Sequence, residues 1–218
     1  MSIPGMSILG SSVPGTRPVV LGLTGSIGMG KSATAAMFAR RGVPVHDADA
    51  AVHALYGAGG AAAAAIGAAF PGTLDAGGAV DRTRLREAVI GAPERLAALE
   101  ALVHPLAQAA ARDFLARHAE APLVLLDIPL LFETGAEARC DHVLVVTAPP
   151  EVQRARVLAR PGMDAATFEA IRAKQMPNAE KRARADFVLD TSLGYDHAEA
   201  EVATLIRQLT AGPVPAAP

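Results

Sequence analysis

The stretch that most constrains the fold of this chain is Gly25-Ser26-Ile27-Gly28-Met29-Gly30-Lys31-Ser32. It matches the phosphate-binding pattern of a glycine, four residues, a second glycine, a lysine and a serine or threonine. An apolar run, residues 18–23, precedes it, and an alanine-rich helical stretch, residues 33–41, follows it. This order predicts a strand, a loop and a helix, the setting in which such a loop binds a nucleoside triphosphate.

Each residue type in this phosphate loop has a chemical reason. Glycines let backbone N–H groups close around phosphate oxygens, Lys31 brings a positive charge to the outer phosphates, and Ser32 can coordinate magnesium. The helix that follows adds the partial positive charge of its N-terminus. A glycine-rich turn could match the pattern by accident, but the strand and helix on either side argue against that interpretation.

Composition restricts the class of partner and the compartment. The chain has 218 residues, 51% of them hydrophobic, which is enough for one α/β domain with an insertion. Its net charge of −2 shows no basic balance, so we expect no nucleic-acid partner. The single cysteine, Cys140, cannot form an internal disulfide, and the apolar stretches are shorter than the roughly 20 residues of a membrane span. We therefore expect a cytoplasmic protein without a membrane partner.

The chain is expected to form a single domain over residues 18–211, between disordered tails at residues 1–17 and 212–218. The first tail is rich in Gly, Ser and Pro and lacks the pattern of a secretory signal. Residues 50–119 are helical in periodicity nearly throughout, which predicts a helical insertion able to hold an acceptor substrate. Within it, His104-Pro105 is expected to separate two helices, residues 94–103 and 106–118.

Further apolar runs predict buried strands at residues 43–46, 123–127, 143–147 and 187–190. With residues 18–23 they form the five-stranded parallel sheet of a doubly wound α/β fold of the P-loop NTPase type, covered by helices on both faces. In such sheets the working groups gather beyond the carboxyl ends of the strands, where Asp47, Asp49 and Asp127 fall. Asp49 is a candidate for catalysis and Asp127 for magnesium binding. A competing interpretation is that Asp49 only caps the next helix.

Between the last two predicted strands the chain turns basic, with eight Lys and Arg residues from 154 to 184. Most are expected to lie on a solvated surface. Arg156 and Arg160 differ, because their spacing of four places them on one helical face just before Pro161-Gly162. A hinge followed by a short helix predicts a mobile lid over about residues 154–184, whose arginines offset charge that develops during phosphoryl transfer.

Taken in order, these landmarks resemble those of the dephospho-coenzyme A kinase family. The resemblance covers about residues 19–207 and rests on the phosphate loop, Asp47-Ala48-Asp49, Leu85-Arg86, His104-Pro105, Pro129-Leu130-Leu131-Phe132-Glu133, Gln175-Met176-Pro177 and Lys181-Arg182-Ala183-Arg184-Ala185-Asp186. It implies a P-loop kinase with a nucleotide core, a helical coenzyme-binding part and a lid. Such an enzyme uses ATP and Mg²⁺ to phosphorylate the ribose 3′-hydroxyl of dephospho-coenzyme A, the final step of coenzyme A synthesis.

The resemblance and the residue chemistry together assign the site. The expected catalytic residues are Asp49 as the base for the ribose 3′-hydroxyl, Lys31, and Arg160 as the lid arginine. ATP is expected to contact Gly28, Met29, Gly30, Lys31, Ser32 and Ala33. The acceptor is expected to contact Asp49, Arg86, His104, Leu130 and Glu133, and magnesium Ser32 and Asp127. The expected partners are the two small-molecule substrates alone, bound to a monomer.

Two positions depart from the family pattern. Ala33 stands where the family usually has threonine, and Thr191-Ser192 follow the last strand where it often has asparagine, which leaves the adenine contact open. Two other functions also remain open: a kinase for a nucleoside monophosphate, and a nucleotide-dependent switch. Asp75-Ala76-Gly77-Gly78 matches the Asp-x-x-Gly of GTPases, but no strand precedes it and no Asn-Lys-x-Asp motif follows, so we interpret it as accidental.

Overall fold

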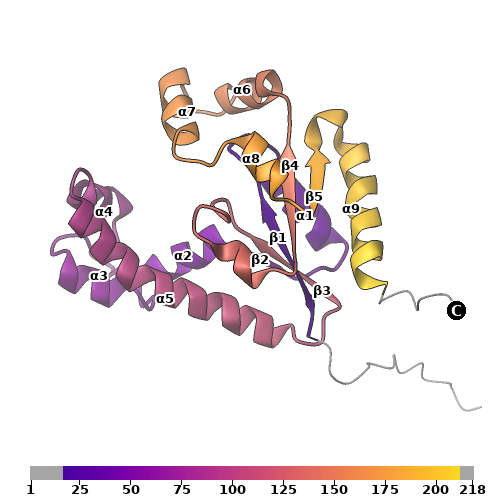
Figure 1. Ribbon diagram of the computed structural model, residues 1–218. Coiled ribbons are helices and arrows are strands. Elements are labelled where there is room, and N and C mark those ends of the chain that lie inside the picture. Colours follow the sequence, from indigo (N-terminus) through magenta and orange to yellow (C-terminus); the bar gives the residue numbers. More distant parts are fainter. Residues whose placement is uncertain (1–16, 212–218) are drawn as a thin grey trace, which may run out of the picture.

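Five apolar segments form one parallel sheet at the centre of the molecule (Figure 1). The computed structural model describes residues 17–211. The strands are β1 (Val19–Thr24), β2 (Val45–Asp47), β3 (Leu123–Asp127), β4 (His142–Thr147) and β5 (Phe187–Asp190). Their order is β2-β3-β1-β4-β5, and every neighbouring pair is parallel. The predicted five-stranded parallel sheet is therefore confirmed.

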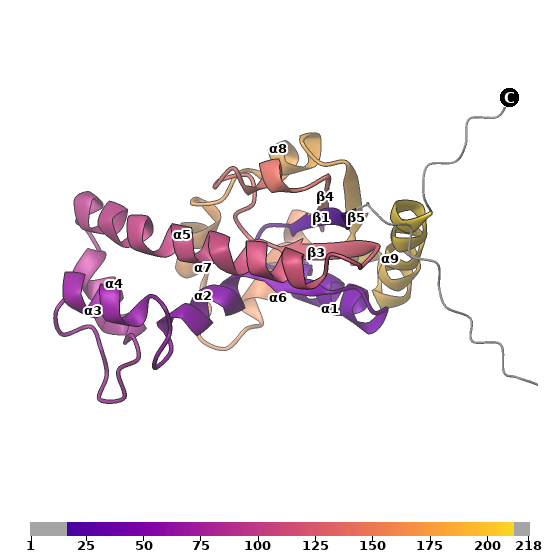
Figure 2. The same cartoon turned by 90° about the horizontal axis from the view of Figure 1, so that it is seen from below.

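Helices connect the strands and cover both faces of the sheet, which Figure 2 shows nearly edge-on. The α-helices are α1 (Lys31–Arg40), α2 (Ala48–Tyr56), α3 (Ala63–Ala69), α4 (Arg82–Val89), α5 (Pro93–Arg117), α6 (Pro150–Leu158), α7 (Ala165–Arg172), α8 (Asn178–Ala183) and α9 (Tyr195–Thr210). Two short 3₁₀ helices are η1 (Ala136–Arg139) and η2 (Thr191–Leu193). Within the described residues, no helix is both long and apolar enough to cross a bilayer.

Strand β3 shows why the sheet is buried on both faces. All of its residues are buried. Leu123 and Leu125 belong to a core cluster with side chains of α1 and α9, whereas Val124 and Leu126 belong to a second cluster with Phe114 of α5. Successive side chains point to opposite faces of a strand, so one apolar run supplies both cores. This is the physical reason why the strand sequences are nearly continuous in apolar residues.

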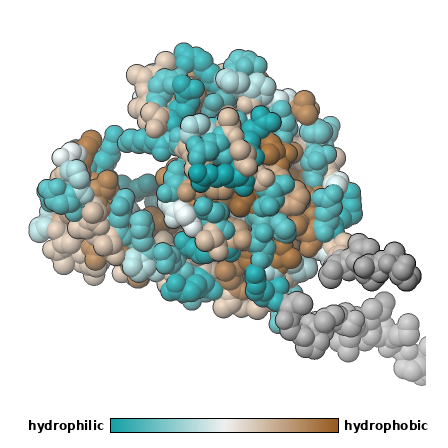
Figure 3. Space-filling model, viewed as in Figure 1, coloured by the Kyte–Doolittle hydropathy of each residue, from teal (hydrophilic) through white to brown (hydrophobic). Residues whose placement is uncertain are grey.

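The helices α3 and α4 and the first half of α5 project from the sheet as a separate lobe (Figure 1). In the space-filling view the lobe stands off from the rest of the molecule (Figure 3). It has its own hydrophobic cluster, which includes Ile66, Phe70, Leu85, Leu99 and Val103. Helices α2 to α5 occupy the range predicted for the helical insertion.

The predicted break at His104-Pro105 is wrong, because α5 runs without interruption from Pro93 to Arg117. Pro105 has no N–H to donate to the carbonyl one turn earlier, so a hydrogen bond of the helix is lost there. Packing on both sides maintains the helix: Val103 contacts the core of the lobe, and Phe114 contacts the core of the sheet. The long helix thus joins the two hydrophobic cores.

The structure also tests two smaller predictions, which concern Asp75 and Arg17. Asp75 Oδ1 accepts hydrogen bonds from the N–H groups of Gly77 and Ala79, at 2.8 and 2.9 Å, so this carboxylate closes a local turn. That role supports the interpretation of the Asp-x-x-Gly match as accidental. Arg17, predicted as the end of a disordered tail, instead forms a two-pronged ion pair with Asp141 at 2.9 and 2.5 Å. The remaining tail predictions fall on residues 1–16 and 212–218, outside the described residues.

Candidate active site

The phosphate loop connects the end of β1 to the start of α1, at the carboxyl edge of the sheet. Gly28 and Gly30 adopt φ values of +80° and +89°, a region that favours glycine. A Cβ atom on Gly28 would also lie 2.5 Å from the side chain of Val157, because α6 packs directly on the loop. Gly30 is the N-cap of α1, so the N-terminus of that helix opens into the loop.

An open cavity of about 470 Å³ lies over the phosphate loop. It is lined by residues 25–33, by Asp49 of α2, by Arg160 just after α6, and by Pro129, Ile171 and Gln175. The structure therefore brings together the predicted ATP-binding residues, the predicted base and the predicted lid arginine. The cavity lies at the end of β1 between β3 and β4, the position at which doubly wound sheets bind ligands.

Lys31 and Asp127 form an ion pair within this site. The Nζ atom of Lys31 donates to Oδ1 of Asp127 at 2.6 Å, and Asp127 is only 3% exposed. Burial raises the pKa of Asp127, Lys31 lowers it, and the nearby charges of Asp47 and Asp49 raise it further. Lys31 is thus held at the phosphate loop by an acid that has little access to solvent.

The two acids after β2 differ in role. Helix α2 begins at Ala48, and Asp47 is its N-cap, with Oδ1 accepting the N–H of Ala50 at 2.9 Å. Asp49 lies in the first turn, is exposed and lines the phosphate cavity. The interpretation that Asp49 caps the helix is therefore wrong, because Asp47 does so and leaves the Asp49 carboxylate facing the cavity.

A second cavity, of about 190 Å³, lies between β2, α5 and the segment after β3. His104, a predicted acceptor contact, lines it together with His46, Gln108 and Arg139. Leu130, also predicted to contact the acceptor, is 40% exposed. It lies on the segment after β3, between Pro129, which lines the phosphate cavity, and Thr134, which lines the second cavity.

Arg86 and Glu133, the other two predicted acceptor contacts, are placed differently. Arg86 is exposed on α4 and does not line either cavity. Glu133 is used inside the protein: Oε1 lies 2.9 Å from Nζ of Lys181 and accepts the N–H of Met176 at 2.7 Å. Lys181 is fully buried. Burial opposes ionisation of Glu133, but the hydrogen bonds from Lys181 and Met176 lower its pKa.

The acceptor contact of Glu133 stays a prediction. Its side chain is 17% exposed, and a carboxylate has acceptor sites beyond those that Lys181 and Met176 use. The Glu133 and Lys181 pair joins the segment after β3 to α8.

The predicted pairing of Arg156 with Arg160 on one helical face is corrected. Helix α6 ends at Leu158, so Arg160 lies beyond the helix, although both arginines line one cavity beside Gly28 and Gly30. Arg156 donates to the hydroxyl and the carbonyl oxygen of Thr191, both at 2.8 Å. The Thr191 hydroxyl in turn lies 3.0 Å from the carbonyl oxygen of Met29 in the phosphate loop. Arg156 therefore braces the end of β5 against the loop.

Sequence reasoning missed this role of Thr191 and two further contacts of the loop, from Gln153 and Gln175 to the backbone of Ile27. Thr191 and Arg156 also line a cavity of about 330 Å³ on the other side of Gly28 and Gly30. The only signal in the sequence was the presence of Gln175 in a family motif, which carried no role. The partners lie too far apart in the chain for local patterns to connect them.

The oxygen donors at the site fit magnesium. Within residues 17–211, no cluster of three or more His, Cys, Asp or Glu side chains could hold a metal ion. Magnesium in kinases, however, takes only one or two protein oxygens beside phosphates and water. The hydroxyl of Ser32 in the first turn of α1 and the carboxylate of Asp127 are donors of this kind.

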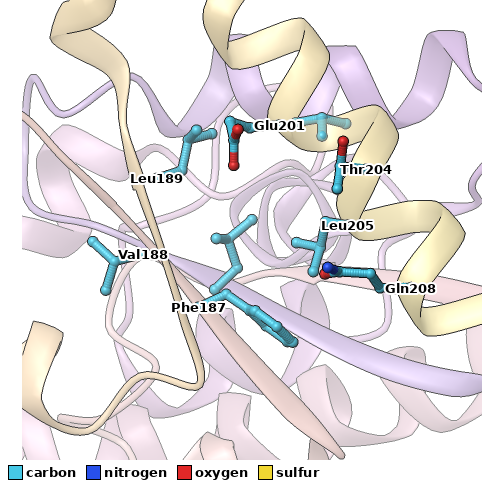
Figure 4. A pocket seen from close by; sticks show the side chains of 9 residues that line it. Phe187, Val188, Leu189, Glu201, Thr204, Leu205 and Gln208 are labelled. Carbon is cyan, nitrogen blue, oxygen red and sulfur yellow. The ribbon is translucent and has the colours of Figure 1, made fainter.

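One cavity lies away from all these groups. It has a volume of about 130 Å³ and lies between β5 and α9, at the edge of the sheet (Figure 4). Its lining is mainly apolar, with Phe187, Leu189 and Leu205, and α9 contributes the polar Glu201, Thr204 and Gln208. No residue of the phosphate loop lines it, so we do not include it in the candidate active site.

The fold and the site define a class, the P-loop kinases: the loop offers N–H groups and a lysine to phosphates, and an acid of α2 lines the same cavity. A family model described as dephospho-CoA kinase matches residues 19–196. The chain therefore belongs to the dephospho-CoA kinase family, and the family predicted from the sequence is confirmed.

Individual relatives agree with this assignment. The dephospho-CoA kinase of Rhizobium meliloti (strain 1021) is 54% identical over 196 residues, which is 89% of this chain and 100% of the relative. That of Mesorhizobium japonicum is 58% identical over 193 residues, 88% of this chain and 96% of the relative. Among solved structures, TT1252 from Thermus thermophilus has a TM-score of 0.79 at 39% identity, and covers 88% of this chain and 98% of its own.

Proposed function

We propose that this protein transfers the γ-phosphoryl group of ATP to the ribose 3′-hydroxyl of dephospho-coenzyme A, giving coenzyme A and ADP. The observation that carries the proposal is that the phosphate loop, Asp49 and Arg160 line one cavity in a member of this family. Relatives of 54% and 58% identity over almost their whole length are named dephospho-CoA kinases. The predicted activity of an ATP-dependent dephospho-coenzyme A kinase is thereby confirmed, whereas the following residue roles are proposals.

The nucleotide phosphates bind to the loop from Gly28 to Ala33. The backbone N–H groups at the N-terminus of α1 donate to phosphate oxygens, and the Lys31 ammonium neutralises the outer phosphates. Arg160 lies across the same cavity and stabilises the charge that develops as the γ-phosphoryl group leaves ADP. Catalysis in this arrangement comes from positioning and charge more than from covalent chemistry.

Asp49 accepts the proton of the attacking 3′-hydroxyl. Its carboxylate is exposed to the phosphate cavity and is not used as a helix cap, so it is available to a substrate. The acceptor approaches from the side of the helical lobe, where His104 lines the adjoining cavity and Leu130 is exposed. Arg86 lies on α4, outside the lining of both cavities, and would bind an outlying part of a long acceptor.

Ser32 and Asp127 would hold a magnesium ion, which when bound supplies positive charge to the phosphate oxygens. In this role Asp127 would share its carboxylate between the ion and Lys31. We also propose that the protein acts in the cytoplasm, as a monomer, with ATP and dephospho-coenzyme A as its partners and without a nucleic acid or a membrane.

The proposal is tested by following ADP release in a coupled assay with three acceptors: dephospho-coenzyme A, AMP, and none. We expect rapid release with dephospho-coenzyme A alone, and mass spectrometry of the product should show one added phosphate on the 3′-oxygen. Faster release with AMP would indicate a nucleoside monophosphate kinase. Tight nucleotide binding with equally slow release in all three reactions would indicate a switch.

A further inference from the structure

One residue of the phosphate loop is held by hydrogen bonds at both of its backbone groups. The N–H of Ile27 donates to Oε1 of Gln175 at 3.0 Å. The carbonyl oxygen of Ile27 accepts from Nε2 of Gln153 at 2.7 Å. Two amide side chains thus bind the backbone of a single residue, Gln175 as acceptor and Gln153 as donor.

The two glutamines flank the segment that carries Arg160. Gln153 is a buried residue of α6, and Gln175 lies just after α7. Between them the chain passes through Arg160, Pro161-Gly162 and α7, and only Phe168 is buried in α7. The segment is therefore joined to the phosphate loop at both of its ends while its middle has little core of its own.

These two hydrogen bonds restrict the orientation of the peptide planes that precede and follow Ile27. A rotation of either plane would separate the N–H from Gln175 or the carbonyl from Gln153, and the loss of a partly buried hydrogen bond costs free energy. Because Gly28 has φ +80°, it would otherwise allow such a rotation easily. The plane that follows Ile27 carries the N–H of Gly28, a residue that lines the phosphate cavity, so the orientation of that N–H depends on the Ile27 contacts.

We propose that Gln153 and Gln175 are positioning residues that hold the Ile27 peptide in the orientation the phosphate loop needs, and so couple the Arg160 segment to phosphate binding. This inference rests on the proposed function. It adds two residues that act through Ile27 without touching the reacting atoms.

The two positions have opposite hydrogen-bond polarity, which gives a sharp test. A glutamate at 175 still offers an oxygen to the N–H of Ile27. A glutamate at 153 offers no donor and sets a carboxylate against the Ile27 carbonyl oxygen. Since glutamate and glutamine have nearly the same shape, a role in packing alone would treat Gln→Glu alike at both positions.

The experiment compares Gln175→Glu, Gln175→Leu, Gln153→Glu and Gln153→Leu with the full-length protein. The first readout is hydrogen exchange of the Ile27 amide, which needs no catalysis. We expect exchange to be faster by about 3- to 10-fold in Gln175→Leu, the range for loss of one net hydrogen bond, and close to the original rate in Gln175→Glu. The second readout is kcat/KM for ATP. We expect a higher value for Gln175→Glu than for Gln175→Leu, and a value for Gln153→Glu that does not exceed that for Gln153→Leu.

Gln208→Glu is the matched control, because Gln208 lies on α9 at the sheet edge, away from the loop (Figure 4). It should leave both readouts unchanged. If a substitution at the buried position 153 prevents folding, the comparison of Gln175→Glu with Gln175→Leu still tests the proposal. Equal exchange of the Ile27 amide in Gln175→Glu and Gln175→Leu, or the same rank of Glu and Leu at both positions, overturns the proposal. Failure of the proposed function would instead appear as absent turnover in the unmodified protein, with the exchange results unaffected.

Discussion

The nucleotide side and the acceptor side of this site are built in different ways. On the nucleotide side, three residues of the phosphate loop form hydrogen bonds with other elements. Lys31 bonds to β3, Ile27 to α6 and to the segment after α7, and Met29 to η2. On the acceptor side, Asp49 and His104 are exposed, and the supporting lobe has a hydrophobic cluster of its own. One side is fixed by the sheet, and the other depends on how a separate lobe lies beside it.

This difference indicates that the contacts for the nucleotide phosphates are in place before substrates bind, whereas those for the acceptor are less fixed. Phosphate groups are alike in all triphosphates, so a rigid loop can be arranged for them in advance, with little reorganisation during the reaction. A long acceptor needs space to enter, and exposed side chains on a separate lobe provide that space. Substitutions on the two sides should therefore differ in which kinetic constant they change.

The largest effect is expected for Asp49→Asn, because a general base contributes about 100- to 10,000-fold to the rate. Single-turnover rates at saturating substrates should fall by that factor, while both substrates still bind. Asp47→Asn is the matched control: asparagine caps a helix about as well as aspartate, so the cap of α2 is kept, and the change removes no proton acceptor from the reaction. A larger loss of rate for Asp47→Asn would reverse the assignment of the base.

Lys31→Met is expected to lower kcat by about 100- to 1,000-fold, the usual cost of removing one group that stabilises transition-state charge. It also leaves the carboxylate of Asp127 buried without its partner. Breaking a buried pair in this way typically costs about 3–5 kcal/mol of stability. The double variant Lys31→Met, Asp127→Asn should recover most of the stability and none of the activity.

The loss of stability in Lys31→Met should depend on pH with a definite sign. Because the pKa of Asp127 is raised by burial, the folded protein binds this proton more tightly than the unfolded chain does. Stability should fall as pH rises from the unfolded pKa through the folded one, and the effect should vanish at pH values below both. Denaturant unfolding of the variant across acidic pH measures it, and an opposite slope would contradict the role of Asp127.

Arg160→Ala should lower kcat by about 10- to 100-fold and weaken ATP binding much less, since the charge that Arg160 offsets develops mainly in the transition state. Arg154→Ala removes an exposed arginine of α6, six residues before Arg160, and is the control. Isothermal titration with ATP and steady-state kinetics give the two quantities. Equal losses in affinity and turnover would show that Arg160 serves in ground-state binding only.

The smallest kinetic effect is expected for Ile66→Ala in the lobe. Ile66 is fully buried there, and such a truncation typically costs about 2–5 kcal/mol. Because the lobe has its own core, the loss should appear as local opening, with a KM for dephospho-coenzyme A raised several-fold and an unchanged affinity for ATP. Hydrogen exchange of α3 and α4 should rise accordingly. A matching loss of ATP affinity would show that the two sides are not independent.

Much of the fold was predictable because its signals are local. The strand of Leu123–Asp127 follows from an unbroken apolar run, and the phosphate loop follows from glycine spacing between a strand and a helix. The continuity of α5 was not predictable, since proline normally interrupts a helix and only the two cores on either side maintain it here. The cap at Asp47 was missed because either acid fits the local pattern.

The sequence by itself determined the nucleotide loop, the five strands, the family and the candidate acid and arginine, because each is specified by neighbours along the chain or by motifs in a fixed order. Only the tertiary structure decided the partners of those groups. The contacts of Ile27 span 148 and 126 residues, and Glu133 meets Lys181 across 48. The physical reason is that a side-chain hydrogen bond needs its two atoms within about 3 Å. Folding alone brings residues so distant in the chain to that separation.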